Sequence, residues 1–207
     1  MERFETEEQQ IEAIKRFWKE NGTIIIVGVV IGLGSLFGWR YYNDSVISSK
    51  ETASSAYQSN LESFIESEDA SALSSFASEF EDTGYAPLAS LIVAQKAVQD
   101  EDYASAKTHL SKAAAGNDEI ADVAKLRLAK VQLQLSEYEA GLSTLDSVLS
   151  DAFADQVNEL KGDLLYAQGK FDEAKSAYNL ALAELPNDQS IKMKIDNIAY
   201  AKTQAVQ

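Results

Sequence analysis

The hydrophobic pattern of the chain changes sharply at residue 21 and again at residue 40. Residues 21–39 are nineteen consecutive positions without a charge, mostly Ile, Val, Leu, Phe and Gly, between Glu20 and Arg40. As an α-helix this run would be about 28 Å long, close to the ~30 Å hydrocarbon thickness of a bilayer. The pattern predicts one transmembrane segment over residues 21–42.

Two other kinds of segment share this pattern. A cleaved signal peptide has a shorter apolar core followed by small residues, whereas bulky Trp39, Arg40, Tyr41 and Tyr42 end this run. A buried helix of a soluble domain is the second alternative, and nineteen positions without a charge disfavour it. We therefore expect an uncleaved signal anchor.

Glycines recur within the predicted span as two pairs of small residues four positions apart. This spacing lets two membrane helices approach closely. It predicts a helix-docking face, although a plain anchor would also tolerate glycine. The face would consist of Gly28, Gly32, Gly34 and Gly38.

Basic residues flank the span unequally. Four precede it within residues 1–20, whereas only Arg40 and Lys50 follow closely and none lies in residues 51–95. Basic residues are enriched on the cytoplasmic side of membrane spans. We therefore expect residues 1–20 to be cytoplasmic and residues 43–207 to lie outside the cytoplasm. An apolar stripe opposite lysine and arginine in residues 9–19 predicts a short interfacial helix.

The remainder of the chain repeats a helical pattern. Three sets of small or apolar residues have internal spacings of 3, 4 and 3, and successive sets are 35 and 33 positions apart. A period near 34 predicts tetratricopeptide-like helix pairs, with an irregular helical bundle as the alternative. In the third set, Gly162 lies twelve residues before Ala174, and Pro186 lies twelve after it. The sets are Tyr103, Ala106, Leu110, Ala113; Tyr138, Gly141, Leu145, Val148; and Phe171, Ala174, Tyr178, Ala181.

The predicted fold is all-α, an N-terminal transmembrane helix followed by a tetratricopeptide-repeat-like α-solenoid. Residues 43–86 would form a degenerate first repeat, and residues 87–188 three clear repeats. Pro87 would occupy the first helical position of these, where its missing N–H costs nothing. Residues 189–207 would form a capping helix and tail.

In such repeats the fifth, ninth and twelfth positions face a concave groove. The groove is predicted to be mixed apolar and acidic, which suits an apolar segment or a basic partner surface. With a single lysine among these positions, a clamp for an acidic carboxyl terminus is disfavoured. The predicted partner-binding residues are Leu91, Gln95, Val98, Leu126, Lys130, Leu133, Glu159, Asp163 and Tyr166.

Composition narrows the function classes. The 207 residues carry a net charge of −15, and residues 43–207 hold 27 acidic against 13 basic residues. Such a surface repels phosphate backbones, so we expect no nucleic-acid partner. Cysteine is absent and His109 is the single histidine, and no phosphate-binding, nucleophile-elbow or zinc-protease motif occurs. We expect an interaction protein, not an enzyme, with no catalytic residue, metal, cofactor or small-molecule substrate.

Three stretches together are similar to one bacterial family. They are residues 6–43, TEEQQIEAIKRFWKENGTIIIVGVVIGLGSLFGWRYYN, residues 126–135, LRLAKVQLQL, and the repeat at residues 155–188. Over essentially its whole length the chain resembles the YfgM family of ancillary SecYEG translocon subunits. The resemblance implies a single-pass inner-membrane protein with its N-terminus in the cytoplasm and a periplasmic tetratricopeptide-like domain.

The same resemblance implies the partners. These are Sec translocon subunits and a membrane-anchored periplasmic chaperone of the PpiD type, so the protein would link the translocon to periplasmic chaperones during export. An envelope-stress regulator, or a helical-repeat scaffold for another envelope complex, is the alternative. The family carries no catalytic residues over to this chain.

Overall fold

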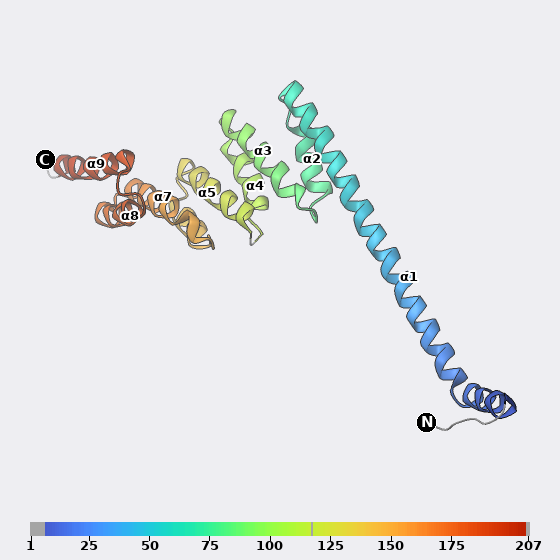
Figure 1. Cartoon of the computed structure of the whole chain (residues 1–207). Helices are drawn as coiled ribbons and strands as arrows, with labels where there is room; N and C mark the ends of the chain where they lie inside the picture. Colours follow the sequence, from blue (N-terminus) through green and yellow to red (C-terminus); the bar gives the residue numbers. More distant parts are fainter. Residues whose placement is uncertain (1–6, 117, 206–207) are drawn as a thin grey trace. The chain divides into compact units, whose positions relative to one another are not determined.

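The computed structural model describes residues 7–116 and 118–205. These two ranges form nine α-helices and one short 3-10 turn and contain no β-strand (Figure 1), so the all-helical prediction is confirmed. Residues 1–6 of the predicted cytoplasmic segment and residues 206–207 of the predicted tail lie outside the described residues. The helices are α1 (Glu7–Ser67), α2 (Ser71–Glu79), α3 (Tyr85–Gln99), α4 (Tyr103–Ala113), α5 (Glu119–Gln134), α6 (Tyr138–Asp146), α7 (Ala154–Ala167), α8 (Phe171–Glu184) and α9 (Gln189–Ala205), with the 3-10 turn at Asp151–Phe153.

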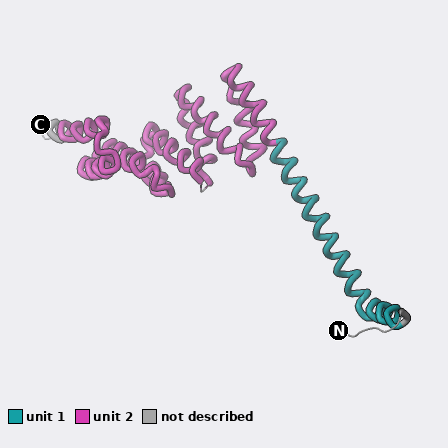
Figure 2. The backbone as a smooth tube through the Cα atoms, in the orientation of Figure 1, with its two compact units in different colours: residues 1–52 teal, residues 53–207 magenta. Residues whose placement is uncertain are grey.

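The chain divides into two compact units, residues 1–52 and 53–207 (Figure 2). Helix α1 continues through residues 42 and 43, the predicted end of the membrane segment. Its last turns, from residue 53 to residue 67, belong to the second unit. The first helix of the degenerate repeat is therefore the C-terminal part of α1.

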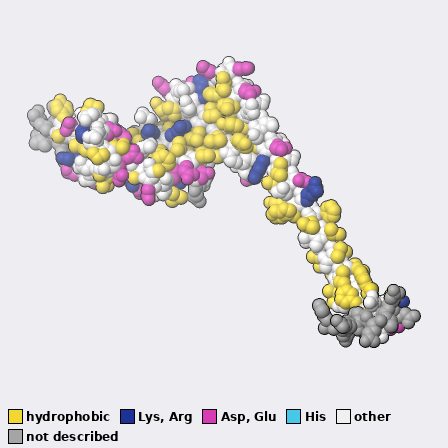
Figure 3. Space-filling model, in the orientation of Figure 1, with side chains coloured by type: hydrophobic (Ala, Val, Ile, Leu, Met, Phe, Trp, Pro, Cys, Tyr) yellow, Lys and Arg dark blue, Asp and Glu magenta, His cyan; other side chains and the backbone are white. Residues whose placement is uncertain are grey.

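The apolar run of α1 is exposed. Helix α1 is long and apolar enough to cross a membrane, and only 6% of its apolar window is buried. Figure 3 shows hydrophobic side chains along this part of the first unit. A core helix of a soluble domain would be mostly buried, so that alternative is wrong for this segment.

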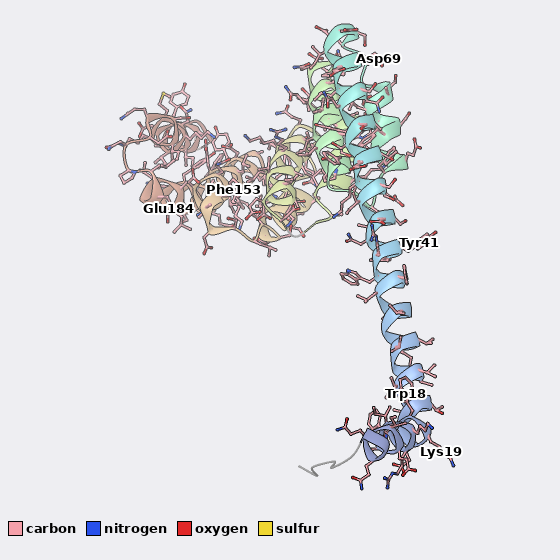
Figure 4. All side chains as sticks on the ribbon, turned by 45° about the vertical axis from the view of Figure 1, so that its right-hand side comes forward. Trp18, Lys19, Tyr41, Asp69, Phe153 and Glu184 are labelled. Atoms are coloured by element: carbon pink, nitrogen blue, oxygen red, sulfur yellow. The ribbon has the colours of Figure 1, made fainter. Side chains whose placement is uncertain are left out.

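Helix α1 bends near Trp18, where its first turns leave the axis of the rest (Figure 4). The Asn21 side-chain amide donates to the Phe17 carbonyl at 3.2 Å, and the Trp18 ring lies against Gly22. A glycine and a side chain that competes for a helix carbonyl are both recognised causes of helix kinks. The apolar stripe before the bend is more than half exposed and consists of Ile11, Ile14, Phe17 and Trp18.

The second unit is a stack of helix pairs. The pairs are α3 with α4, α5 with α6 and α7 with α8, and α9 packs on α8. The end of α1 contributes Tyr57 and Phe64 to a buried cluster with Leu73 and Phe76 of α2, in the place of a further pair. Buried residues form four local clusters, one at each step along the stack.

The turn inside each pair contains one residue in the left-handed backbone region. These residues are Glu68, Glu101, Ser136 and Gly169, with φ between 56° and 75°. They are 33, 35 and 33 positions apart, so the repeat period extends to the degenerate first pair. In the last three turns the next amide donates five residues back, as from Asp102 to the Ala97 carbonyl at 2.8 Å, which is the Schellman C-cap.

Helix α3 begins two residues earlier than expected. Its first residue is Tyr85, so Pro87 is the third helical residue rather than the first. The first four amides of a helix have no intrahelical acceptor, which is why proline is tolerated there as well. The prediction of Pro87 at the first position was wrong by half a turn.

Candidate partner-binding groove

Four of the nine predicted groove residues lie together. Leu91, Gln95 and Val98 of α3 and Lys130 of α5 line one hollow of about 510 Å³, which we call the α3–α5 groove. Its floor is apolar and includes Ala94, Val131, Leu110 and Tyr103, and its rim includes Arg127, Gln99 and Gln134. The groove is therefore a hydrophobic trough with polar edges, a form that suits a peptide-like ligand.

Helical register decides which residues of α5 face this groove. Arg127, Lys130 and Gln134 are spaced 3 and 4 apart and form one stripe on α5. Leu126 and Leu133 lie on a neighbouring stripe and pack in the cluster with α6 and α7, where Leu126 is only 5% exposed. The space between α3 and α5 is open, whereas Leu160 and Leu164 fill the equivalent space between α5 and α7.

The acidic residues predicted for the groove hold a lysine of the same chain. Lys194 Nζ on α9 lies 2.6 Å from Glu159 Oε1 and 2.7 Å from Asp163 Oδ1. Burial lowers the pKa of Lys194, but the hydrogen bonds to Asp163 and Glu159 outweigh it and the net pKa is raised. The C-terminal helix therefore supplies one lysine that pairs with both of the carboxylates predicted to attract a basic partner, and it offsets one of their two charges.

Tyr178 completes this network. Its hydroxyl donates to Asp163 Oδ1 at 2.7 Å, and burial followed by this bond raises the pKa of the phenol well above its usual range. The ninth predicted residue, Tyr166, is partly exposed and contacts Phe171 edge to face at 5.4 Å. These side chains join α7 to α8 and α9.

The α3–α5 groove has an unusual charge for so acidic a chain. Its lining includes Arg127 and Lys130 and no Asp or Glu. Both cations are exposed, and within residues 7–116 and 118–205 neither forms an ion pair or a side-chain hydrogen bond. By contrast, Lys96 and Lys107 nearby pair with Asp100 and Glu137. The groove thus offers two uncompensated positive charges beside an apolar floor.

A second hollow of about 400 Å³ continues from the first and shares Gln95 and Gln99 with it. Leu61 and Ile65 from the end of α1, together with Ile92, line it, and Ile65 is 69% exposed. Figure 3 shows hydrophobic side chains gathered over α3 and its neighbours on this face. The apolar surface therefore crosses three helices.

Two of the predicted repeat-packing residues, Gly141 and Gly162, lie where helices approach closely. A Cβ atom at Gly162 would lie 2.4 Å from the Tyr178 ring, and one at Gly141 would lie 2.8 Å from Leu164. Val148 lies beyond the end of α6 and Pro186 beyond the end of α8. Tyr103, Tyr138 and Phe171 are half-buried. The remaining members are buried: Ala106, Leu110, Ala113, Leu145, Ala174, Tyr178 and Ala181.

The four membrane glycines face open space. A Cβ atom at any of them would meet no other described atom within 4 Å. They leave a shallow strip on α1 to which another helix could dock.

The sequence pattern did not predict one buried ion pair, between Asp122 and Lys125. Asp122 is 2% exposed and accepts from the Leu149 and Ser150 amides and from Lys125 Nζ at 3.0 Å. Lys125 also donates to the Ser147 carbonyl at 2.9 Å. Burial raises the pKa of Asp122, but these bonds outweigh it and hold the pKa below its usual value. The pair fastens the loop after α6 to α5, and its spacing resembles that of an ordinary surface pair.

The described residues contain no group of three or more His, Cys, Asp or Glu able to hold a metal ion. His109 is half-buried, and its Nδ1 has no hydrogen-bond partner. Burial and then nearby Lys112 lower its pKa. His109 also lines an open hollow with Asp69, Asp100 and Asp102, so it is a partly exposed side chain at the edge of the packed helices.

Comparison with known proteins connects these features. The family described as tetratricopeptide repeat-like domain matches residues 15–200. The chain is 37% identical over 211 residues to an "Ancillary SecYEG translocon subunit" of Escherichia coli (strain K12), covering 96% of this chain and all of that protein. Proteins of the same description from Aggregatibacter actinomycetemcomitans and Neisseria gonorrhoeae are 37% and 27% identical, each over 93% of this chain and 97% of the relative.

Proposed function

The chain belongs to the YfgM family of ancillary SecYEG translocon subunits, and from this relationship we propose that it is a membrane-anchored accessory of the Sec translocon. The observation that supports this most is similarity along the entire length of the E. coli relative, from the apolar helix to the last repeat. Because the apolar run of α1 is exposed and long enough for a bilayer, it would anchor the chain by a single pass.

The orientation is part of the proposal. The N-terminus would be cytoplasmic and residues 43–207 periplasmic, because basic residues concentrate before the span. The exposed amphipathic turns before Gly22 would lie on the inner surface of the membrane. The repeat domain would then stand where exported chains emerge.

The mode of action would be binding without catalysis. The stacked helix pairs present a groove of the kind that repeat domains use to hold a partner. A partner held there would be concentrated beside the translocon, which raises its effective concentration without any chemical step. We propose that a membrane-anchored chaperone of the PpiD type is one such partner.

Protease accessibility tests the orientation. In spheroplasts, added protease should digest residues 43–207 of the full chain and leave a protected fragment that contains residues 1–20. A cytoplasmic protein digested only after lysis serves as the control. If the repeat domain is protected in intact spheroplasts, the periplasmic assignment fails.

Affinity purification tests the accessory role. The tagged full chain, extracted in mild detergent, should retain Sec translocon subunits and a PpiD-type chaperone. A variant with residues 21–39 replaced by an unrelated membrane span of equal length is the control for capture by the anchor alone. Retention of a different envelope complex, without translocon subunits, would favour the scaffold or stress-regulator alternative.

A further inference from the structure

We infer that the α3–α5 groove binds a short apolar segment that carries a single carboxylate. The inference rests on the proposed role as an interaction subunit and names the class of segment that it would bind. Three features of the groove support this ligand class: its apolar floor, its two uncompensated cations and its continuation towards α1.

The apolar floor selects hydrophobic side chains. Leu91 is partly exposed and Val98 at the groove edge is 39% exposed, above a floor in which Leu110 and Val131 are already buried. A segment that covers Leu91 and Val98 removes their apolar surface from water, which favours binding. The glutamine amides along the edge can pair with the backbone of an extended segment, since each amide both donates and accepts.

The cations select a carboxylate. Arg127 and Lys130 are one turn apart on α5 and face the groove together. Neither pairs within the described residues, so an incoming carboxylate need not displace an existing partner. An Arg beside a Lys can bind one carboxylate with several charge-assisted hydrogen bonds.

The rest of the chain limits how acidic the segment can be. A net charge of −15 repels a strongly acidic partner at long range. The second hollow is lined by Glu68 and by Lys96, and Lys96 already pairs with Asp100, so this end offers a carboxylate no unpaired cation among its lining residues. One carboxylate placed over α5, followed by apolar residues towards α1, satisfies both ends of the surface.

Helix spacing sets the length of the segment. Neighbouring packed helices are about 10 Å apart, so the surface from α1 across α3 to α5 is about 20 Å wide. An extended chain covers that width in about six residues. A bound helix would cover the same width only with more than three turns.

A pair of matched peptides tests the inference. We would measure binding of two dansylated, amidated eight-residue peptides rich in Leu and Val, identical except for one Glu or Gln near one end, to the full chain in zwitterionic nanodiscs. At low salt the Glu peptide should bind about fivefold more tightly. The preference should shrink at about 0.5 M salt because exposed charges are screened.

Two double variants test whether Arg127 and Lys130 cause the preference for the Glu peptide. R127Q/K130Q should bind both peptides equally and keep the affinity of the wild type for the Gln peptide, since both side chains are exposed and the apolar floor is unchanged. The matched control K175Q/K192Q removes the same charge from α8 and α9 and should keep the preference. Val98→Ser should weaken both peptides.

Several results would overturn the inference. They are equal binding of the two peptides by the wild type, binding of neither peptide, and tighter binding of a third peptide that carries Lys in place of the Glu. A dimer of the chain that the substitution Val98→Lys dissociates would also overturn it. Translocon co-purification is measured in parallel with the same variants. If the full chain retains the translocon but does not bind the peptides as expected, the groove inference fails and the accessory role stands. If it binds the peptides as expected but does not retain the translocon, the accessory role fails and the groove inference stands.

Discussion

The α-carbon of Gly162 on α7 faces the ring of Tyr178 on α8 so closely that a Cβ atom would lie 2.4 Å from the ring carbons. The ring cannot easily retreat, because it is buried and its hydroxyl is held by Asp163 at 2.7 Å. The glycine therefore makes room for an aromatic ring. Ala174, which follows Gly162 by twelve residues in the repeat pattern, lies one turn earlier on α8.

Gly162→Ala should destabilise the repeat domain. Overpacking of this kind costs ~1–3 kcal/mol, and the better helix propensity of alanine offsets at most about 1 kcal/mol of it. Thermal melts of the full chain followed by circular dichroism should show a midpoint lower by about 2–4 °C. Gly84→Ala is the control, because a Cβ atom there meets nothing within 4 Å. Equal midpoints for the two variants would contradict the close approach.

Removing the buried acid should cost far more than removing an exposed one. Asp122→Ala leaves Lys125 buried without its partner, which costs ~3–5 kcal/mol. Asp146→Ala breaks an ion pair with Lys161 in which the Asp146 side chain is 68% exposed, and such pairs contribute ~0–1 kcal/mol. Urea unfolding of both variants in the full chain measures the difference. A similar loss in both would show that the buried pair is not a fastening point.

The contribution of Asp122 should disappear in acid. Its pKa is lowered in the folded chain, so its stabilisation is present above the unfolded pKa of about 4 and is lost as the pH falls through the folded value. The gap in unfolding free energy between the wild type and Asp122→Asn should be constant near neutral pH and shrink below pH ~4. A gap that stays constant down to pH ~2 would contradict a lowered pKa of Asp122 in the folded chain.

Ser136→Gly should stabilise the chain. Ser136 has φ 58° in the turn between α5 and α6, and non-glycine residues pay ~1 kcal/mol or more there. Glycine loses more conformational freedom on folding, which offsets part of this penalty. We therefore expect the free energy of unfolding, measured with urea, to rise by ~0.5–1 kcal/mol. Ser143→Gly, inside α6, is the matched control, and it should lower the free energy of unfolding by a similar amount. A loss in both variants would contradict the turn conformation.

The glycine strip of the membrane segment should be needed for a partner rather than for insertion. Gly32→Leu with Gly38→Leu keeps the segment apolar and removes the close approach between helices. We expect unchanged membrane extraction by carbonate and a loss of translocon subunits in the affinity purification. Leu33→Ala with Phe37→Ala changes the face of the same helix opposite the strip and should retain them. Full retention by the glycine variant would leave α1 a plain anchor.

Sequence reasoning succeeded where a pattern repeats. The 3-4-3 spacings come from a helix that buries one face, and Ala106, Leu110 and Ala113 are buried as that spacing requires. The nineteen uncharged positions predict a helix able to span a membrane, and α1 is long and apolar enough for that. Both signals depend only on residues close together in the sequence, and such residues determine where helices form.

It fell short where the outcome depends on a distant residue. Nothing near Glu159 or Asp163 in the sequence reveals that Lys194, about one repeat later, would occupy them. Glu101 and Ser136 adopt the left-handed backbone region that glycine usually occupies, so the sequence gives no sign of it there. Among these turns only Gly169 has the residue type that such a turn favours. Whether the space beside α5 is open or filled depends on the bulk of the next helix pair, which helical register by itself does not indicate.

The four separate clusters of buried residues have a mechanical consequence. In a protein with one central core, bending disturbs the whole core. Here each helix pair packs only against its neighbours, so bending disturbs the interfaces between adjacent pairs. Small rotations at successive interfaces add along the stack, as the extensions of springs connected in series do. A change in the curvature of the stack can therefore be spread over many interfaces, so that the displacement at any one contact stays small.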